Sequence, residues 1–456
     1  IISTSGNWFT NEAIALGAVT PSAAFSITTT NDNITLGTLL GTSNVTLTSG
    51  NGTISLSNIG ADGTNIGALS LSTSAALSAS GTWYIGNITG NLNLNTTGDL
   101  TIEAGSVDFG NIALGGNLSI TSTAAIDVGT VTGAHNLTLA SGSNGDITLT
   151  TVGTNTTSVG TVNITPHGTG IISTSGNWYT GAATLGAMTL SGNYTITTSD
   201  KAVSLGHVQG AHNLTISTGS GNITLTSLGE SDTKLAALSI TTTGTKTASG
   251  SWHVDSAVST GALVLGGNLA ITTSNDAITL GAITGANDLS LTSGNGTITL
   301  ANIGTNAVDV GNLSLSTSVV VSAAGNWYLG NISGDEAITT TGALTIEAGS
   351  VDFANIIMGG HLSITSTSTI DAGTITGKDK NVTLASGSNG NITVGTLGAT
   401  DNAVGTVNIT PHGTGVISTA GNWLTNAITL GAITPTGAFS ITTSNDAISL
   451  GTLLGT

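Results

Sequence analysis

The chain has 456 residues, of which 66 are glycine and none is cysteine, and 38% are hydrophobic while only 6% are charged. This composition excludes a disulfide-stapled domain and disfavours a disordered chain, because disordered chains are poor in aliphatic residues and rich in charge. The formal net charge is −18. Basic residues are too few for a nucleic-acid partner, and no apolar run approaches the roughly 20 residues of a bilayer span, so we predict no membrane insertion.

A long repeat is marked by the six tryptophans, which are separated by 75, 95, 74, 75 and 96 residues. The copies are close: Thr101–Phe109 recurs unchanged as Thr345–Phe353. Such likeness indicates duplication of a whole unit. The chain starts inside one repeat and ends inside another, so we expect it to be an excerpt of a longer array. We place the repeat units at roughly 1–82, 83–170, 171–245, 246–326, 327–415 and 416–456, the last one partial.

A shorter period runs inside each repeat and consists of Asn followed by aliphatic, polar and aliphatic residues. Strict alternation of this kind predicts β-strands with one aliphatic face, and the Gly and Asn residues between them predict turns. No stretch has the spacing of an amphipathic helix. In chain order, the clearest predicted strands begin at Asn44, Asn117, Asn136, Asn213, Asn312 and Asn381.

A coil of about 19–25 residues with two or three short strands is too small to fold alone, but stacked coils can share one core. We therefore predict an all-β fold, a right-handed parallel β-solenoid (β-helix) of about 20 coils that is continuous over residues 1–456. The alternative is an array of β-sandwich domains of about 75–95 residues, which the shorter period disfavours. The recurring Asn residues predict an interior or edge amide ladder, and we expect the tryptophans in the core rather than as exposed platforms for sugars.

Histidines are the first candidates for chemistry. His167 and His412 share the context Thr-Pro-His-Gly-Thr-Gly, which indicates one duplicated turn. His135 and His212 also share a context, but other copies have Lys or Asn there, which is unlike a ligand. His361 stands where a related copy has Asn, so we interpret it as a substitution in the Asn ladder. The remaining two are His207 and His253.

Carboxylates recur as the pairs Glu103 with Asp108 and Glu347 with Asp352. Two acids at this spacing could share one edge of a solenoid, and glycosidases act through such a pair. No basic residue lies nearby to bind a substrate or to tune a pKa. We therefore predict no catalytic, cofactor-binding or metal site, and a chain that is not an enzyme.

Other polar patterns suggest weaker alternatives. Asp32, Asp276 and Asp446 lie in turns and could cap them, whereas calcium is less expected because the Gly-Asp nonapeptide repeat is absent. Asn-x-Ser/Thr sequons such as Asn44 permit glycosylation. Pairs such as Thr46 and Thr48 suggest ice binding, which variable coil lengths disfavour.

The run Gly-Asn-Leu-Ser-Ile-Thr-Ser-Thr, the Asn-Leu-Thr-Leu-x-Ser-Gly coils and the Ser-Gly-Asn-Trp-Tyr strand resemble repeats of bacterial filamentous-haemagglutinin-like exoproteins and large autotransporter-type adhesins. The resemblance covers essentially the whole chain. It implies a right-handed β-helix, export across an outer membrane, and a stalk or adhesin at the bacterial cell surface.

We accordingly expect a secreted structural and adhesive repeat region, which forms a rod, stalk or filament for adhesion or for a biofilm matrix. Its expected partners are other rods, by self-association, and host or matrix glycans or surfaces. The alternative is a solenoid module that binds or degrades polysaccharide, suggested by the repeated acid pair and the aromatic residues.

Overall fold

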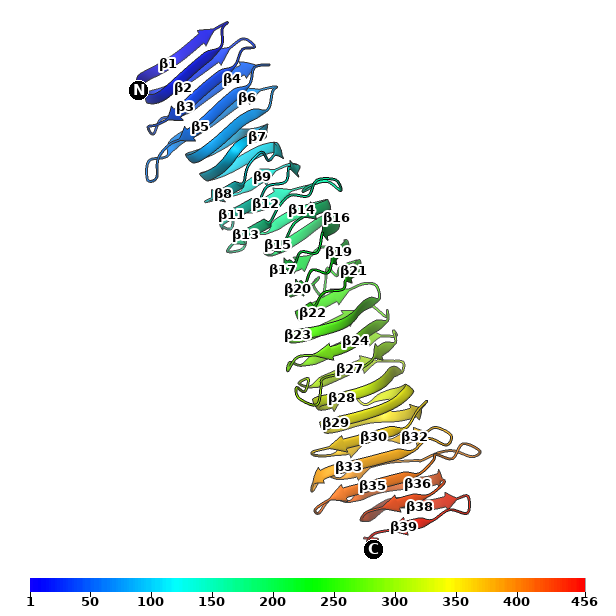
Figure 1. The fold of residues 1–456 in the computed structure, drawn as a ribbon. Helices are drawn as coiled ribbons and strands as arrows, with labels where there is room; N and C mark the ends of the chain where they lie inside the picture. The colour runs from blue at the N-terminus through cyan, green and yellow to red at the C-terminus, as the bar shows by residue number, and fades with distance from the viewer. Residues whose placement is uncertain (456) are drawn as a thin grey trace. The chain divides into compact units, whose positions relative to one another are not determined.

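The computed structural model describes residues 1–455, and within them it contains β-strands and no helix (Figure 1). The strands of the first half of the chain are β1 (Ile2–Thr10), β2 (Ile14–Thr29), β3 (Ile34–Leu39), β4 (Val45–Gly50), β5 (Ile54–Ile59), β6 (Ile66–Thr73), β7 (Leu77–Ala113), β8 (Leu118–Ser122), β9 (Ile126–Val128), β10 (Val131–Thr132), β11 (Leu137–Ser143), β12 (Ile147–Leu149), β13 (Val162–His167), β14 (Ile172–Thr180), β15 (Ala183–Leu185), β16 (Met188–Thr198), β17 (Val203–Leu205), β18 (Val208–Gln209), β19 (Asn213–Gly219) and β20 (Ile223–Leu225). Those of the second half are β21 (Ala237–Thr242), β22 (Lys246–Val254), β23 (Val258–Thr273), β24 (Ile278–Thr284), β25 (Leu289–Gly294), β26 (Ile298–Leu300), β27 (Leu313–Thr317), β28 (Val321–Ser333), β29 (Glu336–Met358), β30 (Leu362–Ser366), β31 (Ile370–Asp371), β32 (Thr374–Thr376), β33 (Val382–Ser388), β34 (Ile392–Thr393), β35 (Val407–His412), β36 (Ile417–Thr425), β37 (Ile428–Leu430), β38 (Ile433–Thr443) and β39 (Ile448–Leu450).

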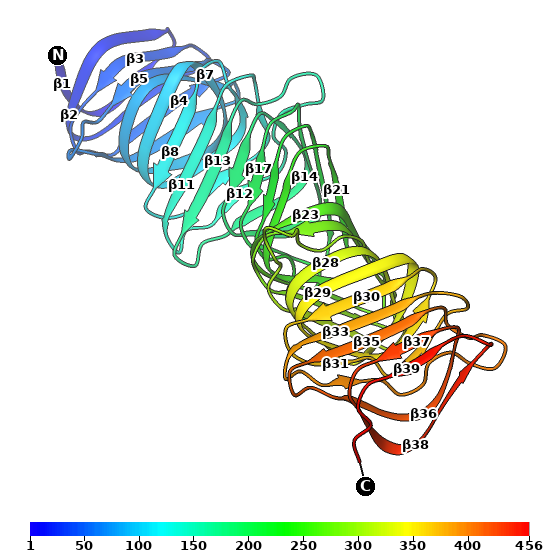
Figure 2. The same ribbon diagram turned by 60° about the horizontal axis from the view of Figure 1, so that its bottom comes forward.

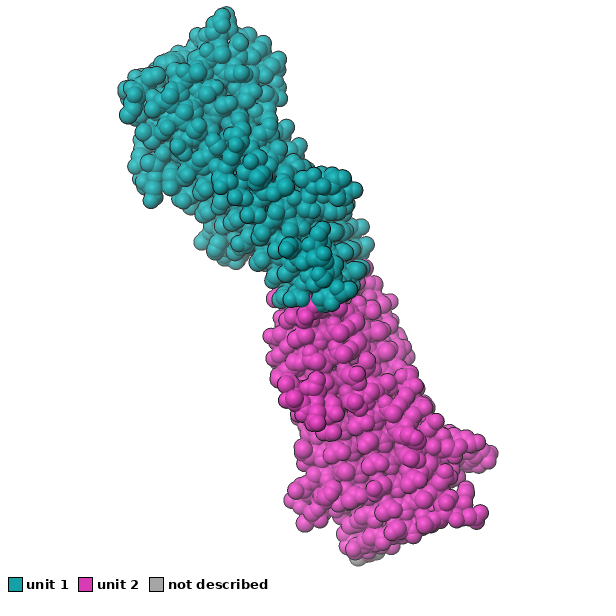
Figure 3. Space-filling model, in the orientation of Figure 1, with its two compact units in different colours: residues 1–225, 239–244 teal, residues 226–238, 245–456 magenta. Residues whose placement is uncertain are grey.

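The chain divides into two compact units, coloured separately in Figure 3. Unit 1 comprises Ile1–Leu225 with Ser239–Gly244, and unit 2 comprises Thr226–Leu238 with Thr245–Thr456. Within each unit every strand pairs in parallel with the equivalent strand of the next coil, and Figure 2 shows these strands as successive rungs. In unit 1, for example, Leu137 of β11 pairs with Leu118 of β8 and with Val162 of β13.

The fold class is therefore confirmed: the protein is an all-β parallel β-solenoid, with about 22 turns. The hand of the winding stays a prediction. Alternation works as the sequence indicated, since Leu137 and Leu139 are buried while Thr138 between them is not. Aliphatic side chains stack on aliphatic side chains from coil to coil, and each fully buried one contributes about 1.5–3 kcal/mol before the entropy of ordering is subtracted.

Each coil passes through three strand segments, which form three columns. In unit 2, Val351, Ile356 and Ile364 of one coil pair with Ile370, Ile375 and Leu384 of the next. We name these columns A, B and C in that order. Coil length varies greatly: in unit 1 a short coil separates the partners Ile172 and Met188, and a much longer one separates Val152 from Trp178. Extra residues leave the coil at its corners, while the paired segments keep their register.

The three tryptophans of unit 2 lie in three different columns. Trp327 pairs with Ile346 in column C, and Trp423 pairs with Leu397 in column B. Trp252 pairs with Ile271, Ile271 with Leu291, and Leu291 with Leu315 of β27. Strand β27 continues this column through Leu313 and Ile332 to the segment of Val351, which is column A.

A repeat is therefore not a whole number of coils. From Trp327 the chain returns to column C four times, at Ile346, Ile364, Leu384 and Ile409, and then passes two further segments to reach Trp423. From Trp252 it returns to column A three times, at Ile271, Leu291 and Leu315, and again passes two further segments to Trp327. The long repeat exceeds the short one by one complete coil.

Candidate functional site

Five surface loops recur at one place in the repeat, one coil before each tryptophan from Trp83 onward. Each is pinched by a reciprocal pair of backbone hydrogen bonds, as in Thr154 N to Thr157 O (2.9 Å) and Thr157 N to Thr154 O (3.2 Å). These paired hydrogen bonds hold the backbone of each loop in a tight turn. We call them corner loops, and they span 60–65, 153–158, 229–234, 304–309 and 398–403.

A glycine opens every corner loop for two reasons. Its φ is positive, between +64° and +70°, which L side chains rarely adopt. A Cβ there would also lie only 2.1–2.4 Å from a backbone carbonyl oxygen of the next coil, that of the residue after the tryptophan. These glycines are Gly60, Gly153, Gly229, Gly304 and Gly398.

The tryptophan of the following coil fills the interior beneath the corner loop. Five of the six tryptophans have 0% exposure, and each indole N–H donates to a backbone carbonyl of the preceding coil, as in Trp178 to Thr150 (3.1 Å) and Trp327 to Ala301 (2.7 Å). Trp178 also packs edge-on against Tyr194 at 5.2 Å. The prediction of core tryptophans is confirmed for these five, while Trp8 is half-buried.

The residue after the tryptophan clamps the two ends of the corner loop and points its side chain outward. In the 304–309 loop, Tyr328 N donates to Ile303 O at 2.7 Å, and Val310 N donates to Tyr328 O at 3.0 Å. The tyrosine ring is half-buried beside the loop. The other residues at this position are Tyr84, Tyr179, His253 and Leu424.

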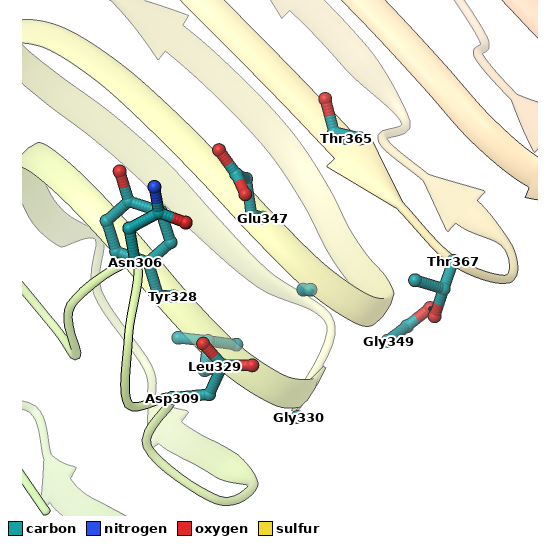
Figure 4. A pocket seen from close by; sticks show the side chains of 10 residues that line it. Asn306, Asp309, Tyr328, Leu329, Gly330, Glu347, Gly349, Thr365 and Thr367 are labelled. Carbon is teal, nitrogen blue, oxygen red and sulfur yellow. Dashed lines mark hydrogen bonds between the residues drawn. The ribbon is translucent and has the colours of Figure 1, made fainter.

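A cleft of about 400 Å³ lies between the 304–309 loop and the next two coils (Figure 4). Asn306 and Asp309 of the loop line one side, and Tyr328 lines the base. Glu347 and Thr365 line the other side, because they are the register partners that follow Tyr328 in the next two coils. We call this set the Tyr–Glu cleft.

The polar groups of the Tyr–Glu cleft are open to a ligand. Asp309, Glu347 and Asn306 are exposed, and no hydrogen bond joins the side chains drawn in Figure 4. The lining contains two carboxylates and no basic residue. The arrangement can thus accept hydrogen bonds from hydroxyl or amino groups next to an aromatic ring, and it repels anions.

Unit 1 carries the same residues at equivalent positions. Tyr84 follows Trp83, and Glu103 precedes Thr121 in the register of the next coil. The corner loop there contains Asp62 and Asn65, where unit 2 has Asn306 and Asp309. Each loop therefore presents one carboxylate and one carboxamide, although the order is reversed.

The predicted acid pairs do not lie on one strand segment. The chain bends at Gly349–Ser350, so Glu347 lies on column C and Asp352 on column A. The neighbour of Asp352 is instead Asp371 of the next coil. Burial, followed by the charges of Asp335 and Asp371, raises the pKa of Asp352 above its ordinary value.

The equivalent acids of unit 1 have the same register. Asp108 pairs in register with Asp127, while Glu103 lies on the preceding segment. Burial, followed by the charge of Asp108, raises the pKa of Asp127. In both units the acid that faces a second acid is thus the aspartate, and the glutamate belongs to the cleft.

Three of the seven histidines make structural contacts through their side chains. His167 and His412 end equivalent strands, and their Nδ1 atoms lie 2.7 and 2.6 Å from the carbonyl oxygens of Ser141 and Ser386. The interpretation of His361 as a ladder residue is confirmed, because its Nδ1 accepts the backbone N–H of Asn381 at 2.9 Å. Among residues 1–455, no three His, Cys, Asp or Glu side chains are grouped closely enough to hold a metal ion.

The Asn ladder lies at the edge of the coils and pairs side chains with backbone. Asp99 Oδ1 accepts the N–H of Asn117 (2.8 Å), Asn117 Oδ1 that of Asn136 (3.0 Å), and Asn136 Oδ1 that of Thr161 (2.8 Å). Each side chain therefore satisfies a turn N–H that no strand partner reaches. This contact explains why Asn, Asp and a histidine that accepts through Nδ1 replace one another there.

The cleft could not be identified from the acid pairs alone, but one signal pointed to it. A tyrosine directly after a tryptophan is followed by a glutamate at the same separation in both Tyr84–Glu103 and Tyr328–Glu347, and a Gly-initiated corner loop precedes both. That separation is one coil, so the two side chains become neighbours.

The residues described hold no helix with the length and hydropathy of a membrane span. Comparison of the chain with family models, with curated proteins and with solved structures gave no match.

Proposed function

We propose that the chain is the structural and adhesive repeat region of a secreted bacterial surface protein, which builds a rod, stalk or filament. The observation that carries the proposal is the unbroken parallel pairing of coils within each unit. The register of this pairing is kept although the coils differ in length, as the partners Ile172 and Met188 and the partners Val152 and Trp178 show. Such a stack gains length with every repeat and needs no second layer. The resemblance to filamentous-haemagglutinin-like and autotransporter-type repeats supports the same proposal.

The outward residues of the coils also suit an extended surface protein. They are mostly Thr, Ser and Asn, as in the pairs Thr138 with Ser119 and Asn163 with Thr138. The net charge of −18 is scattered along the chain, and it helps to keep such a surface soluble. We propose self-association of rods and contact with glycans or matrix surfaces as its interactions.

Electron microscopy of the purified chain tests the proposal. Coils spaced about 4.8 Å apart predict a rod roughly 100 Å long. Negatively stained particles should therefore be thin and elongated, and a chain extended by further copies of the repeat should lengthen in proportion. Compact globules, or particles whose length does not follow the number of repeats, would contradict it.

A polysaccharide-binding module is the second candidate function, and the Tyr–Glu cleft is the observation that favours it. The two candidates are compatible, since a rod can present binding sites along its length. We expect no turnover of polysaccharide, and chromatography of neutral polysaccharides incubated with the chain should show no shorter products.

A further inference from the structure

We propose that the Tyr–Glu cleft and its counterpart in unit 1 bind neutral saccharides. The proposal rests on the second candidate function, for which it names the class of ligand and the residues, and it does not depend on the rod function. The ligand site in unit 2 consists of the Tyr328 ring, the Glu347 and Asp309 carboxylates, the Asn306 amide and the Thr365 hydroxyl.

The aromatic ring is the first argument. Tyr328 lies at the base of a cleft of about 400 Å³, and its backbone is hydrogen-bonded on both sides to the ends of the corner loop. The backbone that carries the ring is therefore held in one place before a ligand arrives, which lowers the entropic cost of binding. An outward tyrosine offers an apolar face to the C–H groups of a sugar ring and a hydroxyl at its rim.

The charge of the lining selects the class of sugar. Carboxylates accept strong hydrogen bonds from hydroxyl groups, and the two in this cleft have no partner among the side chains around them. No basic residue lines the cleft, so uronic or sialic acids would meet Asp309 and Glu347 without a counter-charge. Sugars without acidic groups fit this inventory.

Variation among the copies supports a selected set of residues. Where Tyr is followed one coil later by Glu, in the pairs Tyr84–Glu103 and Tyr328–Glu347, the corner loop carries one carboxylate and one carboxamide. Tyr179 is instead partnered by Thr197, and its corner loop, residues 153–158, has no acid. Glutamate and the loop acid are thus present together or absent together at the three tyrosines. The corner loops before His253 and Leu424 also carry acids, but the register partners of these two residues are threonines.

The experiment measures binding of neutral gluco-, galacto-, manno- and N-acetylglucosamine oligosaccharides to the full chain by saturation-transfer NMR. Polygalacturonate fragments and sialyllactose serve as anionic probes. An open cleft of this size should bind weakly, with Kd on the order of 0.1–1 mM. We expect saturation transfer for at least one neutral oligosaccharide and none for the anionic ones.

Substitutions locate the binding. Tyr84→Ala with Tyr328→Ala, and separately Glu103→Gln with Glu347→Gln, should weaken binding at least about tenfold, which corresponds to ~1.4 kcal/mol. Tyr84→Phe with Tyr328→Phe keeps the rings and should lose less than the alanine pair. Tyr179→Ala is the matched control and should leave the affinity unchanged.

Three outcomes would overturn the proposal: no neutral oligosaccharide binds, the glutamine pair binds as the parent does, or Tyr179→Ala weakens binding as much as the alanine pair. Circular dichroism shows whether each variant folds, and if the alanine pair does not, the glutamine and phenylalanine pairs decide. Rods in the microscope together with absent binding would refute the saccharide site and leave the proposed structural function intact.

Discussion

Two glycines of one corner loop provide a sharp test of why the loops look alike. Gly60 and Gly63 both have a positive φ, +67° and +73°. A Cβ on Gly60 would lie 2.4 Å from the carbonyl oxygen of Tyr84, whereas a Cβ on Gly63 would meet nothing within 4 Å. The variants Gly60→Ala and Gly63→Ala thus share the backbone strain and differ only in the collision with the next coil.

The expected magnitudes follow from these distances. A left-handed alanine costs roughly 1–2 kcal/mol at either position. At Gly60 the Tyr84 carbonyl must also move by about 1 Å to reach ordinary contact, which disturbs the ladder between Ile66 and Ile85. Disruption of one buried backbone hydrogen bond adds about 1–3 kcal/mol. We therefore expect Gly60→Ala to cost about 2–5 kcal/mol and Gly63→Ala about 1–2 kcal/mol.

Hydrogen exchange followed by mass spectrometry is the suitable assay, because stacked coils open locally rather than as one cooperative unit. Amides of the segment 83–88 should exchange about 5- to 150-fold faster in Gly60→Ala than in Gly63→Ala, as a difference of about 1–3 kcal/mol requires. Amides several coils away, for example around Leu137, should be unchanged in both. Equal acceleration by the two substitutions would show that the close approach to Tyr84 does not constrain the loop.

Three further predictions concern the interior, the acid stack and the ladder. Trp178→Phe should lower the free energy of unfolding by about 1 kcal/mol, because the hydrogen bond to Thr150 is lost. Trp178→Ala should lower it by about 3–5 kcal/mol, because a cavity is left in the core. Denaturant melts that rank the two variants in the opposite order would contradict this reasoning. Burial and neighbouring carboxylates raise the folded-state pKa of Asp352. Its contribution to stability is therefore present below the unfolded pKa of about 3.8 and is lost as pH rises through the folded-state pKa. Asp352→Asn should accordingly raise the melting temperature at pH 7 and leave it nearly unchanged at pH 3. His361→Asn should be neutral and His361→Ala should cost about 0.5–1.5 kcal/mol in thermal melts, because only the first keeps an acceptor for the Asn381 N–H.

The sequence was sufficient to predict the strands and turns of a coil, but not the contacts between side chains of neighbouring coils. Alternation around Leu137 and Leu139 depends on local chemistry, so strands, turns and the buried face could be predicted from it. Five of the six tryptophans were correctly placed in the core, from their position in alternating strands. The Glu103 and Asp108 pair was a poorer guide, since proximity in the chain does not reveal the bend that separates the two acids.

Contacts between coils depend on register, and register depends on coil length. Glu347 can be the partner of the residue Tyr328 only if the coil between them has one particular length, whereas coils elsewhere are shorter or longer. Single-sequence patterns do not fix that length. The recurring separation of Tyr and Glu is visible in the sequence, but the contact of Tyr328 with Glu347 and with the corner loop became visible only in the structure.

Each repeat runs two strand segments beyond a whole number of coils, and this has a consequence at the level of the gene. Unequal recombination between repeats adds or removes whole repeats, and every strand downstream still finds a strand beneath it, because all three columns present aliphatic interiors. Such an event turns the following corner loops to another side of the solenoid. Within unit 2, three consecutive repeats present their loops on columns A, C and B. Three repeats are thus the smallest insertion that lengthens the array and returns its loops to their original side.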